Sequence, residues 1–231
     1  MGKFGGKLLA SAILFWTLAT GSSCQHPQVP KEDKSPVPSF DTIAFIGFRP
    51  GLSSSQEPGL VRSTISGAVF SAEPVSEAVA ETLSASLFSL LTQRNGQNWL
   101  PPRETAAAFT ALASSNPTLT DRDIYVRIGQ VLSAQGVLGG HVYRWREREG
   151  TDFAASRPAS VAFDLYLMSA GDGAVLWKAR FDKTQISLSE NLFDLQTFLK
   201  ARGRWMTAGE LADLGLAEIV ETFPREEKER K

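Results

Sequence analysis

Cysteine is nearly absent from this chain, which has a single one, Cys24, among 231 residues. One cysteine excludes an intramolecular disulfide framework and any metal site built from several cysteines. An excess of charge of one sign is also lacking, because 24 basic side chains stand against 25 acidic ones. Since phosphate binding needs a local excess of lysine and arginine, this balance argues against nucleic acid as a partner.

Long apolar runs are scarce as well, although 42% of the residues are hydrophobic, enough for one domain with a sizeable core. The apolar run Leu8–Leu18 has eleven residues, whereas a helix that crosses a bilayer needs about 20. Lys3 and Lys7 precede this run, and small residues separate it from Cys24. The order of basic, apolar and small residues is typical of an export signal, which we predict over residues 1–23.

The small residues directly before Cys24 resemble the lipobox of bacterial lipoproteins. The resemblance implies that Cys24 becomes the lipidated first residue of the mature chain, anchored by several acyl chains. In that family, a residue other than aspartate after the cysteine directs the protein to the outer membrane, and Gln25 stands there. We therefore expect a lipid-anchored protein on the periplasmic face of the outer membrane. The alternative is an ordinary secretory signal followed by a free cysteine.

The residues that flank the predicted domain are polar. Residues 24–39 carry four prolines among charged side chains and have no apolar periodicity, which predicts a flexible, semi-extended tether after the lipidated cysteine. His26 lies there, and we interpret it as a solvated residue rather than a metal ligand. Residues 225–231 predict a charged, disordered tail. Loss of residues 1–23 removes two lysines and leaves 22 basic against 25 acidic residues, a net charge of -3.

Residues 40–224 read as one domain in which strands and helices alternate. The apolar run Thr42–Phe48 predicts a strand that is buried on both faces. Residues 49–72 predict a long loop, with a strand pair or a membrane-touching hairpin as alternatives. The periodicity predicts further strands over 98–100, 137–145, 161–167 and 175–181, and helices over about 73–93, 104–113, 121–134 and 207–222.

Three short segments carry a family resemblance: residues 44–48 (Ala-Phe-Ile-Gly-Phe), residues 136–142 (Gly-Val-Leu-Gly-Gly-His-Val), and residues 165–177 with Gly171-Asp172-Gly173 at a turn. They resemble a group of envelope lipoprotein domains, namely the amino-terminal domain of TolB, the curli-secretion channel lipoprotein CsgG and the lipoprotein activators of penicillin-binding proteins. The resemblance covers residues 40–220 and implies an α/β (α+β) domain, a mixed sheet packed against helices.

Residues suited to catalysis or metal binding are few. No phosphate-binding glycine loop, nucleophile elbow or zinc-protease motif is present, and we expect no cofactor and no metal site. His141 is the only histidine in the domain, and a histidine on a strand is more often a packed residue than a catalyst. Asp121 and Asp123 stand near a predicted helix start, where they favour the helix as cap residues. Asp164 is expected on the outward face of its strand.

Two segments are candidates for contacts with other molecules. The basic cluster Arg144–Arg148 mixes cations with an aromatic residue and two nearby glutamates, and we interpret it as a solvated strand end rather than a nucleic-acid surface. The segment 185–205 is longer than the family pattern requires, and its apolar residues fit an amphipathic helix at about 189–201. Such a helix either packs on the sheet or docks a partner. The candidate docking residues are Leu192, Phe193, Phe198 and Trp205.

These observations together predict a non-catalytic lipoprotein that acts as an adaptor or assembly factor in the bacterial cell envelope. Its expected partners are the membrane, through the N-terminal lipid, and an envelope protein; nucleic acid is not expected, and a homo-oligomer is left open. Two alternatives from other classes remain. One is an envelope hydrolase or small-ligand-binding protein that uses a site around His141. The other is a subunit of an oligomeric secretion channel.

Overall fold

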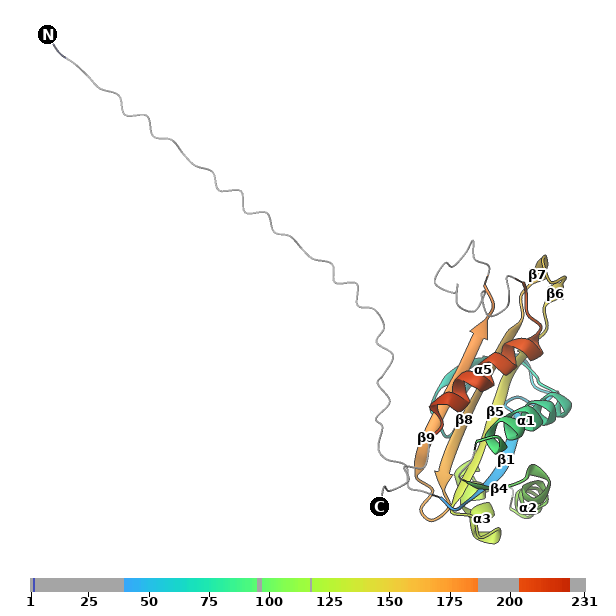
Figure 1. The fold of residues 1–231 in the computed structure, drawn as a ribbon, viewed down its shortest axis with the longest axis vertical. Helices are drawn as coiled ribbons and strands as arrows, with labels where there is room; N and C mark the ends of the chain where they lie inside the picture. The colour runs from blue at the N-terminus through green and yellow to red at the C-terminus, as the bar shows by residue number, and fades with distance from the viewer. Residues whose placement is uncertain (1, 3–39, 95–96, 117, 187–203, 225–231) are drawn as a thin grey trace. The chain divides into compact units, whose positions relative to one another are not determined.

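The computed structural model describes residues 2, 40–94, 97–116, 118–186 and 204–224. Its centre is a five-stranded mixed sheet in the order β4-β1-β5-β8-β9. β1 runs parallel to β4 and β5, while β8 is antiparallel to both β5 and β9. The strands of this sheet are β1 (Thr42–Pro50), β4 (Asn98–Leu100), β5 (Gly136–Arg146), β8 (Ser160–Ser169) and β9 (Val175–Thr184). The predicted mixed sheet is confirmed (Figure 1).

Helices and two short strand pairs complete the described part of the chain. The helices are α1 (Glu77–Thr92), α2 (Pro102–Ser115), α3 (Asp121–Val131) and the C-terminal α5 (Ala208–Thr222). The strand pairs are β2 (Gly59–Arg62) with β3 (Val69–Ala72), and β6 (Glu149–Gly150) with β7 (Ala155–Arg157). The predicted α+β class with a C-terminal helix is therefore confirmed. Within the described residues, no helix is both long and apolar enough to cross a membrane.

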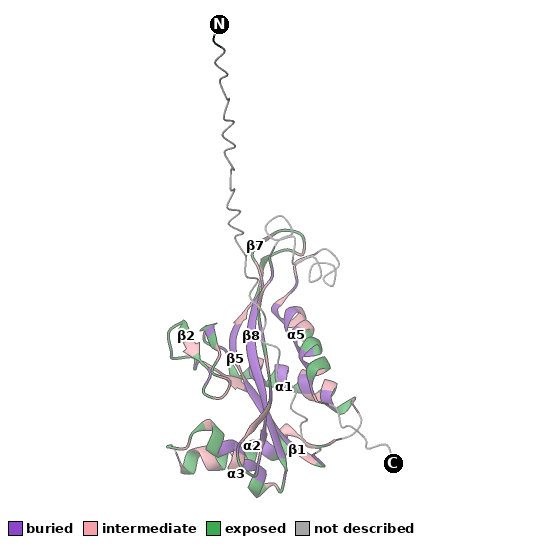
Figure 2. Ribbon diagram, turned by 90° about the vertical axis from the view of Figure 1, so that its left-hand side faces the viewer, coloured by how far each residue is buried: buried purple, intermediate pink, exposed green. Residues whose placement is uncertain are grey.

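The sheet is covered on both faces, as Figure 2 shows with the sheet seen nearly edge-on. α1 and α5 pack on one face, where Leu83 and Leu211 join the apolar side chains Phe163 and Phe181. On the other face, α3 covers one end of the sheet and the β2–β3 pair covers the middle. Burial of this apolar area from both sides is the main favourable contribution to folding.

The alternation of side chains along β8 explains one correct prediction and one error. Phe163 and Leu165 face α1 and α5, as their period of two predicts. The opposite side of β8 is buried too, because α3 and the β2–β3 pair cover it. Asp164 was therefore expected on an outward face but is completely buried.

The region between β1 and α1 differs from the main expectation. Residues 49–72 contain the antiparallel pair β2–β3 rather than one long loop, so the strand-pair alternative is the one observed. Since β3 extends to Ala72 and Pro74 follows it, α1 begins at Glu77 instead of about residue 73. Its N-cap is Ser76, whose side chain accepts a hydrogen bond from the Val79 N–H at 3.4 Å.

Two adjacent glycines let other groups come close to β5. A Cβ on Gly140 would lie 1.9 Å from the backbone oxygen of Asp164, and one on Gly139 would lie 2.3 Å from the hydroxyl of Tyr125. A larger residue at Gly140 must push the β8 backbone away, whereas one at Gly139 must displace the Tyr125 side chain. The two glycines thus allow Tyr125 and the β8 backbone to lie close to β5 just before His141, the next residue in the chain.

Candidate functional site

Three polar residues form a row across the centre of the sheet, and we call Arg49, His141 and Asp164 the polar row. Arg49 of β1 is the register partner of His141 in β5, and His141 is the register partner of Asp164 in β8. Neighbouring strands lie about 4.8 Å apart, so side chains on the same face of such a row can interact. The polar row lies on the face that α3 and the β2–β3 pair cover.

Arg49 is held by three groups. Its Nη2 donates to Asp121 Oδ1 of α3 at 3.0 Å and lies 3.2 Å from His141 Nε2. Its guanidinium carbon lies 4.2 Å from the ring centre of Phe109 in α2, a cation–π contact. The arginine therefore connects β1 to both helices on this face.

Asp121 has a different role from the one that the sequence predicted. The N-cap of α3 is Thr120, which forms a capping box with Asp123. Asp121 instead pairs with Arg49 and accepts a hydrogen bond from Thr64 at 2.8 Å. Burial raises the pKa of Asp121, but the Thr64 hydroxyl and the Arg49 charge outweigh burial and leave the pKa below its usual value.

His141 is engaged at both ring nitrogens. An arginine can only donate, so Nε2 of His141 must accept from Arg49, and the ring proton is on Nδ1. Nδ1 then donates to the hydroxyl oxygen of Tyr166 at 2.6 Å. Burial and the Arg49 charge lower the pKa of His141 to about 4, although Asp121 opposes this shift. The imidazole is neutral near pH 7, and it has no unoccupied nitrogen.

Asp164 connects the polar row to the turn between β2 and β3. Its Oδ2 accepts a hydrogen bond from the Ser66 hydroxyl at 2.7 Å, and Tyr143 OH lies 3.4 Å from the same atom. Its Oδ1 accepts from the backbone N–H of His141 at 3.3 Å. Burial raises the pKa of Asp164 above its usual value, although these donors oppose the shift. The carboxylates of Asp121 and Asp164 thus hold the β2–β3 turn, because they accept hydrogen bonds from Thr64 and Ser66.

Loss of the Ser66 hydroxyl is expected to loosen this turn. Ser66→Ala should lower the free energy of unfolding by about 1–3 kcal/mol, because a buried carboxyl loses a hydrogen-bond donor. Urea titration measures the loss, and faster amide exchange in the β2–β3 turn would place it there. Ser54→Ala, at an exposed serine of the preceding segment, is the matched control and should change stability by less than about 0.5 kcal/mol. Equal losses in the two variants would contradict the role of Ser66.

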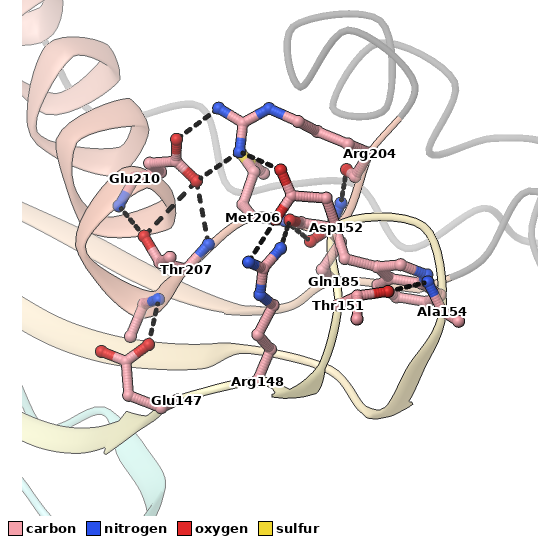
Figure 3. Close-up of polar contacts among 12 residues, drawn as sticks. Glu147, Arg148, Thr151, Asp152, Ala154, Gln185, Arg204, Met206, Thr207 and Glu210 are labelled. Carbon is pink, nitrogen blue, oxygen red and sulfur yellow. Dashed lines mark hydrogen bonds and ion pairs between the residues drawn. The ribbon is translucent and has the colours of Figure 1, made fainter.

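A second polar cluster ties the end of β9 to the start of α5, and Figure 3 shows it. We call Glu147, Arg148, Asp152, Gln185, Arg204 and Glu210 the brace. The side chain of Gln185 is buried, donates to the backbone oxygen of Arg204 at 3.0 Å and accepts from the backbone N–H of Met206 at 2.7 Å. The chain just after β9 is therefore fixed beside the chain just before α5.

Ion pairs complete the brace. Arg148 pairs with Asp152, and Arg204 pairs with both Asp152 and Glu210 (Figure 3). Glu147 accepts from the backbone N–H of Ala208 at 3.0 Å, in the first turn of α5. A carboxylate at that position satisfies a free helix N–H and interacts favourably with the helix dipole.

The docking residues expected from the sequence lie only partly within the described residues. Leu192, Phe193 and Phe198 are outside them, as is the predicted helix over 189–201. Trp205 is described and half-buried, and its backbone N–H donates to the Asp152 backbone oxygen at 2.7 Å. Cys24 and His26 are also outside the described residues.

The basic cluster Arg144–Arg148 is not the solvated strand end that we expected. Arg144 is buried and binds Ser160 at 2.7 Å, the Ser71 backbone oxygen at 2.7 Å and Asp182 at 2.5 Å. Arg146 pairs with Glu73, and Arg148 belongs to the brace. The partners of Arg144 and Arg146 lie between 16 and 73 positions away in the chain, so the residues around these two arginines do not reveal them. These arginines connect elements within the domain.

Metal ligands do not cluster in the part of the chain that the structure describes. No group of three or more histidine, cysteine, aspartate or glutamate side chains there is arranged to hold a metal ion. The carboxylates near His141 are occupied by arginine and hydroxyl donors, as described above. The arrangement can fix a turn and orient three strands, but it offers no open coordination position.

Comparison with known proteins found likeness only among solved structures. No protein-family model matches the chain, and no curated protein matches it. The chain is similar to PelC of Paraburkholderia phytofirmans, solved as a dodecamer, with 14% identity, a TM-score of 0.46, and coverage of 83% of this chain and 95% of that one. It is also similar to the LpoB C-terminal domain of Salmonella enterica, with 14% identity, a TM-score of 0.38, and coverage of 66% and 87%.

A third similar structure is the lipoprotein GNA1162 of Neisseria meningitidis, with 16% identity, a TM-score of 0.38, and coverage of 70% of this chain and 93% of that one. The likeness is distant in all three cases. The functional proposals below therefore depend on the residues of this chain.

Proposed function

We propose that this chain is a lipoprotein anchored at the periplasmic face of the outer membrane, where it acts as a non-catalytic adaptor or assembly factor. The observation that carries the proposal is the position of Cys24, between the apolar run of residues 8–18 and the proline-rich tether. Lipidation accounts for the only cysteine in the chain. Each buried methylene of an acyl chain contributes about 0.8 kcal/mol, so several chains give stable anchoring. The overall charge of the mature chain, -3, does not favour attachment to anionic lipid.

The proposal divides the chain into four parts. Residues 1–23 are the signal, residues 24–39 the lipidated cysteine and tether, residues 40–224 the folded domain, and residues 225–231 a charged tail. A tether of about 15 residues at about 3.1 Å each would let the domain stand roughly 45 Å from the membrane. That distance gives an adaptor access to partners in the periplasm.

The non-catalytic role is supported by the state of His141. A general base needs a free nitrogen within reach of a substrate proton. Arg49 and Tyr166 occupy both nitrogens of His141, and its pKa near 4 makes it a weak base. Two polar groups, Arg49 and Tyr166, do lie next to this histidine, as a hydrolase site would require. Because they occupy both ring nitrogens, the histidine is not available as the general base that the hydrolase alternative needs.

The partner-docking residues stay part of the proposal. We infer that Leu192, Phe193, Phe198 and Trp205 contact an envelope protein partner. Support comes from the apolar composition of segment 185–205 and from the brace, which fixes the residues on either side of 187–203. A docking segment held at both ends loses less conformational entropy on binding than a free one. The sequence motifs that resemble TolB, CsgG and the penicillin-binding-protein activators also favour an envelope role.

Labelling with radioactive palmitate tests the anchor. The wild-type chain should incorporate palmitate and fractionate with the outer membrane, whereas Cys24→Ala should lose the label completely and appear in the soluble periplasmic fraction. Gln25→Asp is the matched variant, which should keep the label but move to the inner membrane. Palmitate that persists in Cys24→Ala would refute the anchor.

Light scattering on the detergent-solubilised protein separates the adaptor from the secretion-channel alternative. An adaptor that works as a single copy gives the mass of one chain, about 25.1 kDa before processing. A channel subunit gives a ring of many copies, which negative-stain electron microscopy would show directly. A ring would replace the adaptor role with the channel role while leaving the lipid anchor in place.

A further inference from the structure

β9 is an edge strand of the sheet, since β8 is its only neighbour among the described strands. Figure 1 shows it as the outermost strand. It has 10 residues, and at about 3.4 Å per residue it presents an edge about 34 Å long. An edge strand exposes a row of N–H and C=O groups that can pair with another strand.

The register identifies which backbone groups face outward. The N–H of Gln185, just after β9, donates to the Ala159 oxygen at 3.0 Å and so points toward the β8 side. Backbone groups alternate in direction along a strand, and the β8–β9 register is regular from Trp177 to Thr184. The residues whose N–H and C=O groups point away from β8 are therefore Lys178, Arg180, Asp182 and Thr184.

The side chains of these outward residues make the edge basic. Lys178 is exposed and has no ionic partner among the described residues. The side chain of Arg180 is 47% exposed, although it also donates to the Val69 backbone oxygen at 3.2 Å and lies over the Phe70 ring. Asp182 is the one acid in β9, and it is neutralised by Arg144 at 2.5 Å and Arg180 at 2.8 Å. A positive edge thus stands in a chain whose overall charge is slightly negative.

The other face of β9 is apolar. Trp177 and Phe181 are buried beneath α5, and Ala179 between them is half-buried. A strand added beside β9 would alternate in the same way, with one set of side chains next to Lys178 and Arg180 and the other set next to this apolar row. The edge therefore selects a sequence in which acidic and apolar residues alternate.

We propose that the outer edge of β9 binds an extended acidic segment of a partner protein, which adds to the sheet as a sixth strand. Backbone hydrogen bonds would supply affinity, and acidic side chains opposite Lys178 and Arg180 would supply specificity. The inference rests on the adaptor role proposed above and gives the partner a defined chemistry. A second copy of this chain does not fit as well, because two basic edges would repel each other.

Fluorescence anisotropy with a short probe peptide tests this proposal on the full-length chain in detergent. The probe is a labelled, end-capped peptide of sequence Thr-Glu-Val-Glu-Val-Glu-Thr, and its control carries lysine in place of each glutamate. At low salt the acidic peptide should bind at least tenfold more tightly than the basic one, and added salt should weaken its binding. Equal binding of the two peptides would overturn the proposal.

Two substitutions at Lys178 separate the backbone contribution from the charge contribution. Lys178→Pro removes an outward N–H without breaking the β8–β9 ladder, so it should weaken binding of the acidic peptide at least tenfold. Lys178→Glu creates a like-charge pair and should weaken binding by about fivefold to tenfold. Arg103→Glu, at an exposed position of α2, makes the same charge change elsewhere and should leave binding within about twofold of wild type.

Thermal melts by circular dichroism establish that each variant is folded, and Lys178→Glu keeps the test valid if the proline variant does not fold. Unchanged binding in the glutamate variant would overturn the proposal. Dimers of the chain that form without peptide and disappear in Lys178→Pro would show that a second copy occupies the edge instead, which also overturns it. Because Cys24→Ala should bind the peptide as wild type does, failure of the lipid anchor and failure of the β9 edge are measured separately.

Discussion

Gly140→Ala is expected to lower the free energy of unfolding by about 3 kcal/mol, at the upper end of what overpacking in a core costs. The added Cβ would lie 1.9 Å from the Asp164 backbone oxygen and 2.9 Å from its carbonyl carbon. Backbone atoms cannot rotate away as a side chain can, so β5 and β8 must separate at their centre. The polar row, which needs the two strands in register, should be disturbed with them.

Urea titration followed by circular dichroism measures this effect, because the midpoint falls while the slope stays constant if only stability changes. Gly59→Ala is the matched control, since a Cβ at this β2 position would meet no atom within 4 Å. It should change stability by less than about 0.5 kcal/mol. A Gly140→Ala variant as stable as Gly59→Ala would show that β5 and β8 are not packed as closely as described.

Acidification is expected to destabilise the protein between pH 6.5 and pH 4 because of His141. The pKa of this histidine is about 4 in the folded chain and about 6.5 when unfolded. Above pH 6.5 the histidine is neutral in both states, and its contribution is fully present. As the pH falls from 6.5 to 4, only the unfolded state takes up the proton, so about 3 kcal/mol of stability is lost in this window.

Urea titrations at several pH values between 7 and 4 measure this loss, and His141→Gln is the comparison variant. Glutamine can still accept from Arg49 but does not titrate, so its stability should vary less across the window. Asp164, whose pKa is raised by burial, contributes with the opposite sign, since its contribution is lost as the pH rises through its folded pKa. Asp164 is present in both proteins, so comparing them isolates the histidine. Parallel pH profiles would contradict the neutral state assigned to His141.

Arg49→Met provides a direct test of what holds the histidine neutral. The pKa of His141 should rise above about 4 but stay below its usual value, because the arginine charge is removed while burial, the larger cause of the shift, remains. Proton NMR can follow the two histidines of the chain separately. The signal of His26, which lies in the predicted tether, should be the same in the wild type and in Arg49→Met and serves as the internal control. A pKa that stays near 4 would mean that burial alone depresses it.

The sequence alone predicted correctly those strands whose pattern lies in residues close together in the chain. The apolar run of β1 and the strands on either side of Gly171-Asp172-Gly173 both follow from residues close together in the chain. Each of these features depends on alternation or turn chemistry, which act over a few residues. The fold class followed from their order.

The candidate sites could not be predicted, because their contacts join distant residues. Asp164 was expected to be exposed, since nothing near it in the chain shows that Ser66, 98 positions away, covers it. From the sequence alone, Arg144 was expected in a solvated basic cluster. In the structure, Asp182 and the Ser71 backbone oxygen lie beside it. The burial of a polar residue depends on which element packs over its strand, and a single sequence does not encode that locally.

The brace has a consequence for how the length and sequence of residues 187–203 can change among related proteins. Gln185 bonds to the backbone of Arg204 and Met206 and so joins the chain before and after residues 187–203 at one point of the domain. Closure entropy grows slowly with length, by about 0.6 kcal/mol for each doubling. Related proteins could therefore lengthen, shorten or replace this segment with little effect on the sheet, and recognition could change while the scaffold stays the same.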